Sequence, residues 1–157
     1  MTDVLRDLAA RIRAEVADLS HTAELAQRRW DKATADSDYL GSVALDLESF
    51  YQGVERCLAL VAKIVDGRVP SGEQWHQALL AQMAAEVEGV RPAVISEEAK
   101  APLDRLRGFR HVARNVYAFN LSPDKISGLV LGLPLVLELV QADLQAFAGF
   151  LEEAASR

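Results

Sequence analysis

The sequence predicts an all-α fold, an antiparallel bundle of four to five helices, and three observations support this. Apolar residues recur three or four positions apart along nearly the whole chain, which is the spacing of one helix face. No segment shows the strict alternation of apolar and polar residues that is typical of a half-buried strand. The chain has 157 residues and is 50% hydrophobic, which suffices for one core. We therefore expect a single helical domain over residues 1–157.

The N-terminal part predicts two long antiparallel helices joined by a short turn. We expect the first helix from about Asp3 to Lys32 and the second over roughly Tyr39 to Val65. Between them, Asp36, Ser37 and Asp38 break the apolar pattern and offer caps. The apolar stripe of the first helix comprises Val4, Leu8, Ile12, Val16, Leu19, Ala23 and Ala26. That of the second comprises Leu40, Val43, Leu47, Phe50 or Tyr51, Val54, Leu58, Val61 and Val65.

Three further helices are predicted after the segment DGRVPSG. Ser71, with Gln74 three residues on, resembles a capping box, so a third helix is expected to start there and to extend to Val87. Ser96 caps a fourth helix that ends near Tyr117 or Phe119. The fifth helix starts at Ser122-Pro123, runs to about Ala154, and is expected to bend at Pro134.

The fifth helix is apolar on more than one face between Ile126 and Val140. Such a helix is either central in its own chain or lies in a subunit interface. We favour a homodimer that buries part of this helix, and the alternative is a monomer with a bent central helix. Its uncharged part is shorter than the ~20 residues of a membrane span, so no membrane insertion is expected. The charged N-terminal residues exclude a secretory signal and favour a cytoplasmic protein.

Charge and cysteine usage narrow the classes of function. The net charge of −6 argues against a general nucleic-acid-binding surface, so any such role needs a local basic patch. The single cysteine, Cys57, lies in an apolar run and is expected to be a buried thiol. No carboxylate cluster suits magnesium and no Cys/His spacing suits zinc, so we expect neither a metal ion nor another cofactor.

The segment from Lys100 to Asn115 is the basic patch, with five cationic residues against one acid. Helical spacing places Arg110, Arg114 and Tyr117 on one face, and Arg107, His111 and Arg114 on an overlapping one. Arginine binds phosphate in a forked geometry, and histidine can transfer a proton to or from a hydroxyl. These groups suit phosphodiester chemistry without a metal. The alternative is a solvated or ion-paired helix face with no chemistry.

Residues Leu45 to Phe150 resemble the HepT-like ribonuclease toxins of the HEPN superfamily. The resemblance rests on the segments LESFYQGVERCLALVAKIVDGRVPSGEQWHQALLAQM, VRPAVIS and LDRLRGFRHVARNVYAFNLSPDKI. It implies a four- or five-helix bundle that dimerises through the motif helix and cleaves RNA without a metal at a cleft between two subunits. It also implies a minimal nucleotidyltransferase as antitoxin, which in related systems modifies the motif tyrosine with adenylate, here Tyr117.

The superfamily motif consists of an arginine, a polar residue, a short spacer and a histidine, often with a tyrosine two places on. Aligned on Arg110 and Tyr117, the histidine position is occupied by Asn115. A second frame pairs Arg105 with His111 but loses the tyrosine. In the preferred first frame, either His111 has taken over proton transfer or the protein binds RNA without efficient cleavage.

The resulting hypothesis is a ribonuclease-type toxin whose partners are RNA, a nucleotidyltransferase antitoxin and a second copy of the chain. Its catalytic residues are predicted to be Arg110, His111, Arg114 and Asn115, with Arg105 and Arg107 binding phosphate and Tyr117 as the modification site. The first alternative is a non-catalytic module that binds the nucleotidyltransferase or RNA, and the second is a structural bundle whose arginines pair with its own acids. His76, beside Trp75, is expected to pack or cap rather than to catalyse.

Overall fold

The structure is a computed structural model that describes residues 1–114 and 120–157, without the side chains of residues 111, 112 and 114. Within this part of the chain the regular elements are all helices. The only extended pairing there is an isolated bridge between Val87 and Arg91. The predicted all-α class is therefore confirmed.

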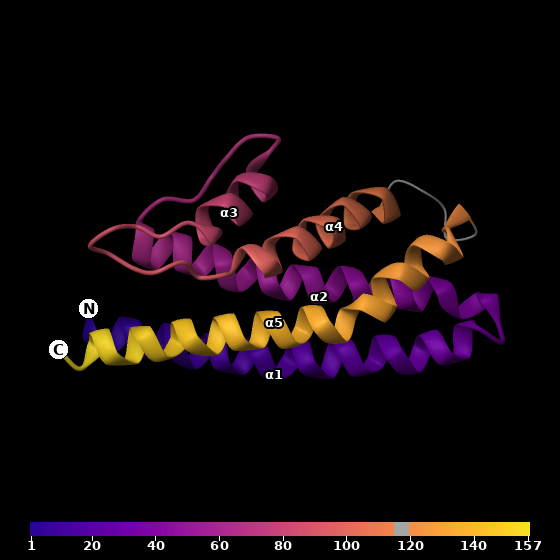
Figure 1. The fold of residues 1–157 in the computed structure, drawn as a ribbon, viewed down its shortest axis with the longest axis horizontal. Coiled ribbons are helices and arrows are strands. Elements are labelled where there is room, and N and C mark those ends of the chain that lie inside the picture. The colour runs from indigo at the N-terminus through magenta and orange to yellow at the C-terminus, as the bar shows by residue number, and fades with distance from the viewer. Residues whose placement is uncertain (115–119) are drawn as a thin grey trace.

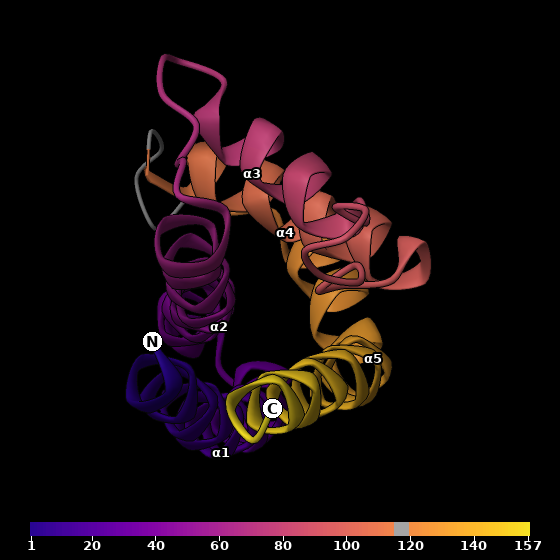
Figure 2. The same ribbon diagram turned by 90° about the vertical axis from the view of Figure 1, so that its left-hand side faces the viewer.

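Four long helices form an up-down-up-down bundle: α1 (Thr2–Ala33), α2 (Leu40–Val61), α4 (Glu97–Arg114) and α5 (Pro123–Ala155). Figure 1 shows α1 and α5 side by side and antiparallel, with α2 running back along α1. The end view in Figure 2 places α4 next to α5 and the short α3 (Trp75–Ala84) beside α4. This arrangement leaves α4 in contact with α2, α3 and α5.

The helical hairpin forms as predicted. A 3₁₀ turn over Ser37–Tyr39 joins α1 to α2, and the Asp36 carboxylate caps it by accepting a hydrogen bond of 3.0 Å from the Asp38 amide. At its other end α2 continues as a π-helical turn over Ala62–Asp66. The predicted stripe of α1 is buried from Leu8 to Ala26. Val4 was wrongly assigned to it, because the first turn of α1 extends beyond the core and leaves Val4 exposed.

The third helix is shorter than predicted at both ends. The capping box at Ser71 does not form, because Gly72 has a φ of +94° that no helical residue adopts, and α3 begins only at Trp75. At the other end α3 stops at Ala84, since the next residue is extended. Val87 instead donates a backbone hydrogen bond of 3.0 Å to the Arg91 carbonyl.

The chain after α3 is fixed by a fully buried ion pair. The Arg91 guanidinium binds both carboxylate oxygens of Asp66, at 2.6 and 2.8 Å, and neither side chain is more than 2% exposed. Its remaining donors reach the backbone carbonyls of Gln82, Ala85 and Pro92. The pair thus ties the end of α2 to the loop that leads into α4.

Both C-terminal helices begin at the caps that the sequence predicts. The Ser96 hydroxyl accepts from the Ala99 amide at 3.3 Å and donates to Asp143 of α5 at 2.8 Å, and the Ser122 hydroxyl accepts from the Lys125 amide at 3.3 Å. Pro134 lies inside α5, and Figure 1 shows the first part of this helix inclined toward α4, as expected of a helix with an internal proline.

One face of α5 packs into the core and the other does not. The buried face runs from Ile126 through Val140 to Leu151, whereas Leu131 and Leu135 are 66% and 62% exposed. By length and composition α5 could also cross a membrane, a criterion that core helices of soluble proteins meet as well. The helix is therefore not central in its own chain, and its apolar outer face has no cover within the described residues.

We predict that Arg91→Met lowers the free energy of unfolding at pH 7 by about 3–5 kcal/mol, because it leaves the buried Asp66 carboxylate without its partner. Burial alone would raise the pKa of Asp66, but hydrogen bonds from Arg91 and Gln82 outweigh burial and lower it. The pair therefore stabilises the fold fully above the unfolded pKa of about 3.9 and loses this contribution as pH falls through the lower, folded value. Urea unfolding at pH 7 and pH 3 measures both effects.

Arg13→Met is the matched control, because Arg13 forms an equally short ion pair with Glu152, 2.6 Å, on the surface. We expect no measurable loss of stability from it. Equal destabilisation by the two variants would contradict the role given to the buried pair.

Candidate functional site

The structure describes the side chains of three predicted site residues, Arg105, Arg107 and Arg110. His111 and Arg114 belong to the last turn of α4. The remaining predictions lie outside the described part of the chain: the side chains of His111 and Arg114, and the whole of Asn115 and Tyr117. The site can therefore be built from Arg110 and from what surrounds it on α2 and α3.

The Arg110 guanidinium lies between two carboxylates of α2. Its Nε is 3.7 Å from Glu48 Oε1 and its Nη1 is 3.8 Å from Glu55 Oε1. These are ion-pair distances rather than hydrogen bonds, and the buried Nε has no hydrogen-bond partner among the described residues. The three side chains are only 11–16% exposed, so their attraction is weakly screened and offset by desolvation. The two carboxylates thus hold Arg110 in place.

The face of α2 that meets α4 supplies these acids. Glu48, Tyr51 and Glu55 are spaced three and four residues apart and therefore lie on one side of the helix. Tyr51 is fully buried between them, and its hydroxyl has no hydrogen-bond partner in the described part of the molecule. Burial, and then the charge of Glu55, raise the pKa of Tyr51, against the opposing guanidiniums of α4. The phenol therefore stays neutral beneath the arginine.

His76 joins this group from the first turn of α3. Its Nδ1 is 2.6 Å from Glu55 Oε2, and its ring stacks on Trp75 with centroids 3.7 Å apart. One carboxylate, Glu55, therefore has the histidine at one oxygen and Arg110 at the other. The sequence predicts a packing or capping role for His76 but does not identify this partner. We call Glu48, Tyr51, Glu55, His76 and Arg110 the polar cluster.

The other two arginines do not converge on one phosphate site. Arg107 forms a hydrogen bond of 2.7 Å with Asp104, one turn earlier in α4, and is 22% exposed. Its charge lies close enough to Tyr51 to oppose the rise in the pKa of that phenol. Arg105 is exposed and lines the groove between α4 and α5 instead. Of the predicted cations, the structure therefore brings Arg107 and Arg110 to one side of α4 and Arg105 to another.

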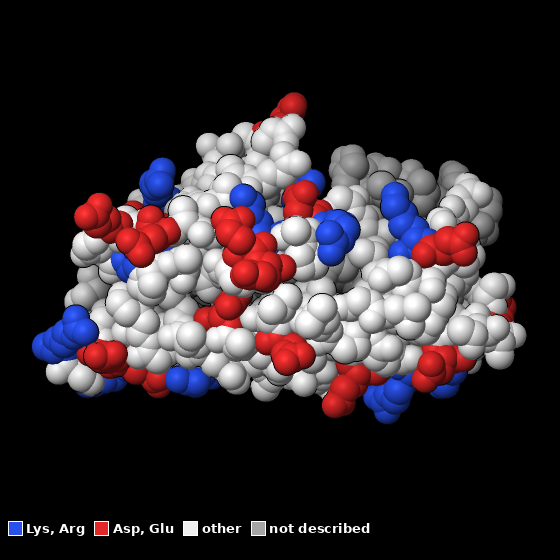
Figure 3. All heavy atoms as spheres, in the orientation of Figure 1, with Lys and Arg blue, Asp and Glu red and all other residues white. Residues whose placement is uncertain are grey.

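The groove between α4 and α5 is apolar, with a volume of about 320 Å³. Small residues open it, because a Cβ added at Gly128 or Gly132 would meet no atom within 4 Å. Leu135 of the outer face lines it from α5, and Arg105 lies at its edge. In Figure 3 the surface over the inclined part of α5 is largely free of charged side chains.

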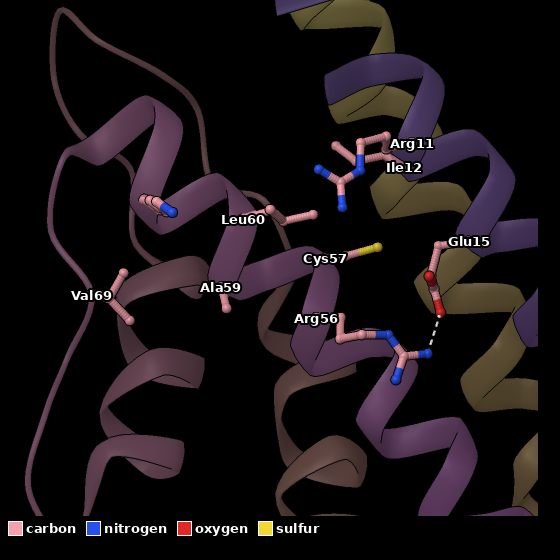
Figure 4. A pocket seen from close by; sticks show the side chains of 9 residues that line it. Arg11, Ile12, Glu15, Arg56, Cys57, Ala59, Leu60 and Val69 are labelled. Carbon is pink, nitrogen blue, oxygen red and sulfur yellow. Dashed lines mark hydrogen bonds and ion pairs between the residues drawn. The ribbon is translucent and has the colours of Figure 1, made fainter. Parts of the chain in front are cut away.

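A second hollow, of about 420 Å³, lies between α1 and α2 and contains none of the predicted site residues. Figure 4 shows that the Cys57 sulfur points toward α1, near Ile12 and Glu15, and that Arg56 bonds Glu15 at 2.9 Å. Burial, and then the charge of Glu15, raise the pKa of Cys57 to about 12. The predicted buried thiol is confirmed, since Cys57 is 3% exposed.

The polar cluster offers a fixed cation and an acid–base pair, and no group of three or more potential metal ligands occurs among the described residues. Sequence reasoning missed Glu48 and Glu55. The available signal was two acids seven residues apart beside the apolar stripe of a long helix, with a tyrosine between them. That spacing shows that the two acids lie on one face of α2, but it does not show which helix packs against that face.

A family model described as HepT-like protein matches residues 42–151, which is well over half of the chain. This range includes most of α2, all of α3 and α4 and most of α5, and hence the whole polar cluster. No curated protein and no solved structure matches the chain significantly.

We predict that Cys57 resists alkylation in the folded protein, because its pKa of about 12 leaves only about one thiol in ten thousand ionised at pH 8 and the sulfur is shielded. Iodoacetamide labelling followed by mass spectrometry should show modification only in denaturant. Rapid labelling of the native protein at pH 8 would contradict the placement of Cys57 between α1 and α2.

Proposed function

Because the chain belongs to the HepT-like family, we propose that it is a ribonuclease-type toxin that cleaves RNA without a metal ion, with a nucleotidyltransferase as its antitoxin. The proposed setting is the cytoplasm. Arg110 and Arg114 would bind the scissile phosphate, His111 would transfer a proton and Asn115 would orient a phosphate oxygen. Arg105 and Arg107 would bind flanking phosphates, and Tyr117 would be the site that the partner modifies with adenylate.

The position of Arg110 is the observation that carries this proposal. A guanidinium stabilises the charge that develops on a phosphodiester during cleavage, provided that it is already oriented. Glu48 and Glu55 fix Arg110 from two sides without taking up its Nε in a hydrogen bond. The family membership supports the proposed reaction class, and the polar cluster adds an anchored cation on α4.

A non-catalytic module that binds the nucleotidyltransferase or RNA is the second candidate function, and one observation favours it. The charge of Arg110 is already balanced by two carboxylates, so an incoming phosphate must compete with them. Asn115 at the motif histidine position points the same way, because an amide accepts no proton. In this case α4 would serve recognition alone.

We predict that the purified protein cleaves single-stranded RNA in EDTA, and that Arg110→Ala slows this cleavage about 100-fold or more, since one preorganised charge is lost. His111→Ala should slow it by at least about as much, because a proton-transfer group is lost. Gel-resolved cleavage of a labelled RNA measures the rates, with Arg28→Ala, a substitution on α1, as the control.

Melting curves of each variant separate loss of chemistry from loss of fold. Full activity in Arg110→Ala would overturn the assignment. Cleavage that appears only when Asn115→His is introduced would overturn the ribonuclease function of the natural chain and support the binding module.

We propose that a second copy of the chain covers the apolar outer face of α5 and the groove beside α4. This face is continuous with the motif helix, so a twofold contact would bring the two α4 helices together, as a composite cleft requires. Exposed leucines next to a groove opened by glycines suit close packing between identical helices.

We predict that the wild-type protein is a dimer and that the double variant Leu131→Glu/Leu135→Glu is a monomer, because two charges would be buried without partners. Light scattering coupled to size exclusion gives both masses. Leu45→Glu on α2 is the matched control, since Leu45 is 59% exposed and lies away from this groove. A monomeric wild type at micromolar concentration would contradict the proposed interface.

A further inference from the structure

Among the histidine side chains that the structure describes, only His76 makes a strong polar contact, and the function proposed above leaves it unused. Its Nδ1 lies 2.6 Å from Glu55 Oε2, and Glu55 itself is only 9% exposed. The contact links α3 to α2, which lie 21 residues apart in the chain at these two positions. A separation this short is typical of a charge-assisted hydrogen bond.

This contact fixes the orientation of the imidazole. A carboxylate only accepts hydrogen bonds, so Nδ1 carries the hydrogen and donates it to Glu55. In the neutral ring Nε2 then has the free lone pair and can accept a proton. The His76 side chain is 29% exposed, and stacking on Trp75 restricts its rotation. The arrangement is that of a histidine base oriented by a carboxylate.

The same carboxylate connects this base to the motif arginine. Glu55 Oε1 lies 3.8 Å from Arg110 Nη1, while Glu55 Oε2 binds His76. A cation suited to phosphate and a base suited to a hydroxyl are therefore bridged by a single side chain.

We propose that His76 is a catalytic residue that accepts the 2′-hydroxyl proton of an RNA substrate, with Glu55 as its positioning residue; this rests on the proposed ribonuclease function. The 2′ oxygen forms a bond to phosphorus, and its proton passes to His76 Nε2. The bond between phosphorus and the 5′ oxygen breaks, and the leaving oxygen takes a proton from water. The products are a 2′,3′-cyclic phosphate and a 5′-hydroxyl, and the imidazolium returns its proton to solvent.

The pH dependence of cleavage distinguishes this role from a structural one. The charged group in contact with His76 is Glu55 of α2. Glu55 in turn faces Arg110 of α4, which also pairs with Glu48, and the charges of Glu55, Arg107 and Arg110 act on Tyr51. Only the neutral imidazole accepts a proton, so a general base at His76 makes the wild-type rate rise with pH on the acidic side of its profile. If His76 only packs against Trp75, replacing it should leave the shape of the pH profile unchanged.

The experiment compares single-turnover cleavage of a labelled single-stranded RNA in EDTA by the wild type, His76→Gln and Glu55→Gln. We expect His76→Gln to be at least about 100-fold slower, to bind RNA as tightly as the wild type and to lose the rising limb. Glu55→Gln should retain the limb at a lower rate, because the base remains but is less well oriented. His21→Gln, an exposed position on α1, is the matched control.

Imidazole rescue keeps the test decisive if His76→Gln melts early. Added imidazole should restore cleavage by His76→Ala but not by Arg110→Ala, because imidazole replaces a base and not a guanidinium. If the wild type cleaves, and His76→Gln keeps its rate and its pH profile, the role of His76 is overturned while the ribonuclease function stands. If the wild type cleaves no RNA, both proposals fall.

Discussion

The contact between α2 and α4 is built around one charge, and the rest of the site depends on it. Arg110 lies deep enough that it needs an anion beside it, and Glu48 and Glu55 provide two. Removing either partner would leave a poorly solvated charge, which is far more costly than losing a surface ion pair. This constraint sets the register of α4 on α2, and through Glu55 it also sets the first turn of α3, where His76 binds. Three helices are thus aligned by polar contacts at the edge of an apolar core.

The helices could be predicted from the sequence because their information is local. The three-to-four spacing of apolar residues gave α1, α2 and the buried face of α5, and the caps at Ser96 and Ser122 form as predicted. Asp36, predicted to cap the second helix, instead caps the 3₁₀ turn before it, and α2 begins without a side-chain cap. The predicted start of α3 at Ser71 was wrong, because the sequence pattern of a capping box does not show that Gly72 has a positive φ. For the site, spacing placed the arginines on α4. It could not identify Glu48 or Glu55 as their partners, because that pairing depends on how two helices meet.

Two arginines of α4 lie in different environments, and each environment suits a different function. Arg110 is enclosed by acids, whereas Arg105 is exposed beside an apolar groove and the outer face of α5. An enclosed guanidinium is oriented, which suits chemistry, while an exposed one suits attraction of a polyanion or contact with a second subunit. The exposed leucines Leu131 and Leu135 on α5 favour contact with a second subunit, because an exposed apolar face is unfavourable in water.

Glu55 supports the proposed chemistry by orienting two side chains and opposes it by repelling phosphate. Which of these two effects is larger decides between catalysis and binding. As a hydrogen-bond acceptor it orients His76, and as an anion it holds Arg110. The same negative charge repels an approaching phosphate. A phosphate must therefore bind Arg110 while the ion pairs of Arg110 with Glu48 and Glu55 stay in place. Among the described residues the buried Nε has no hydrogen-bond partner and only the longer ion-pair contact with Glu48, so one donor of the guanidinium is not used in a hydrogen bond. A second cation near the phosphate would offset the repulsion, so the proposed catalysis requires a further positive charge at this site, whereas recognition through the exposed Arg105 does not.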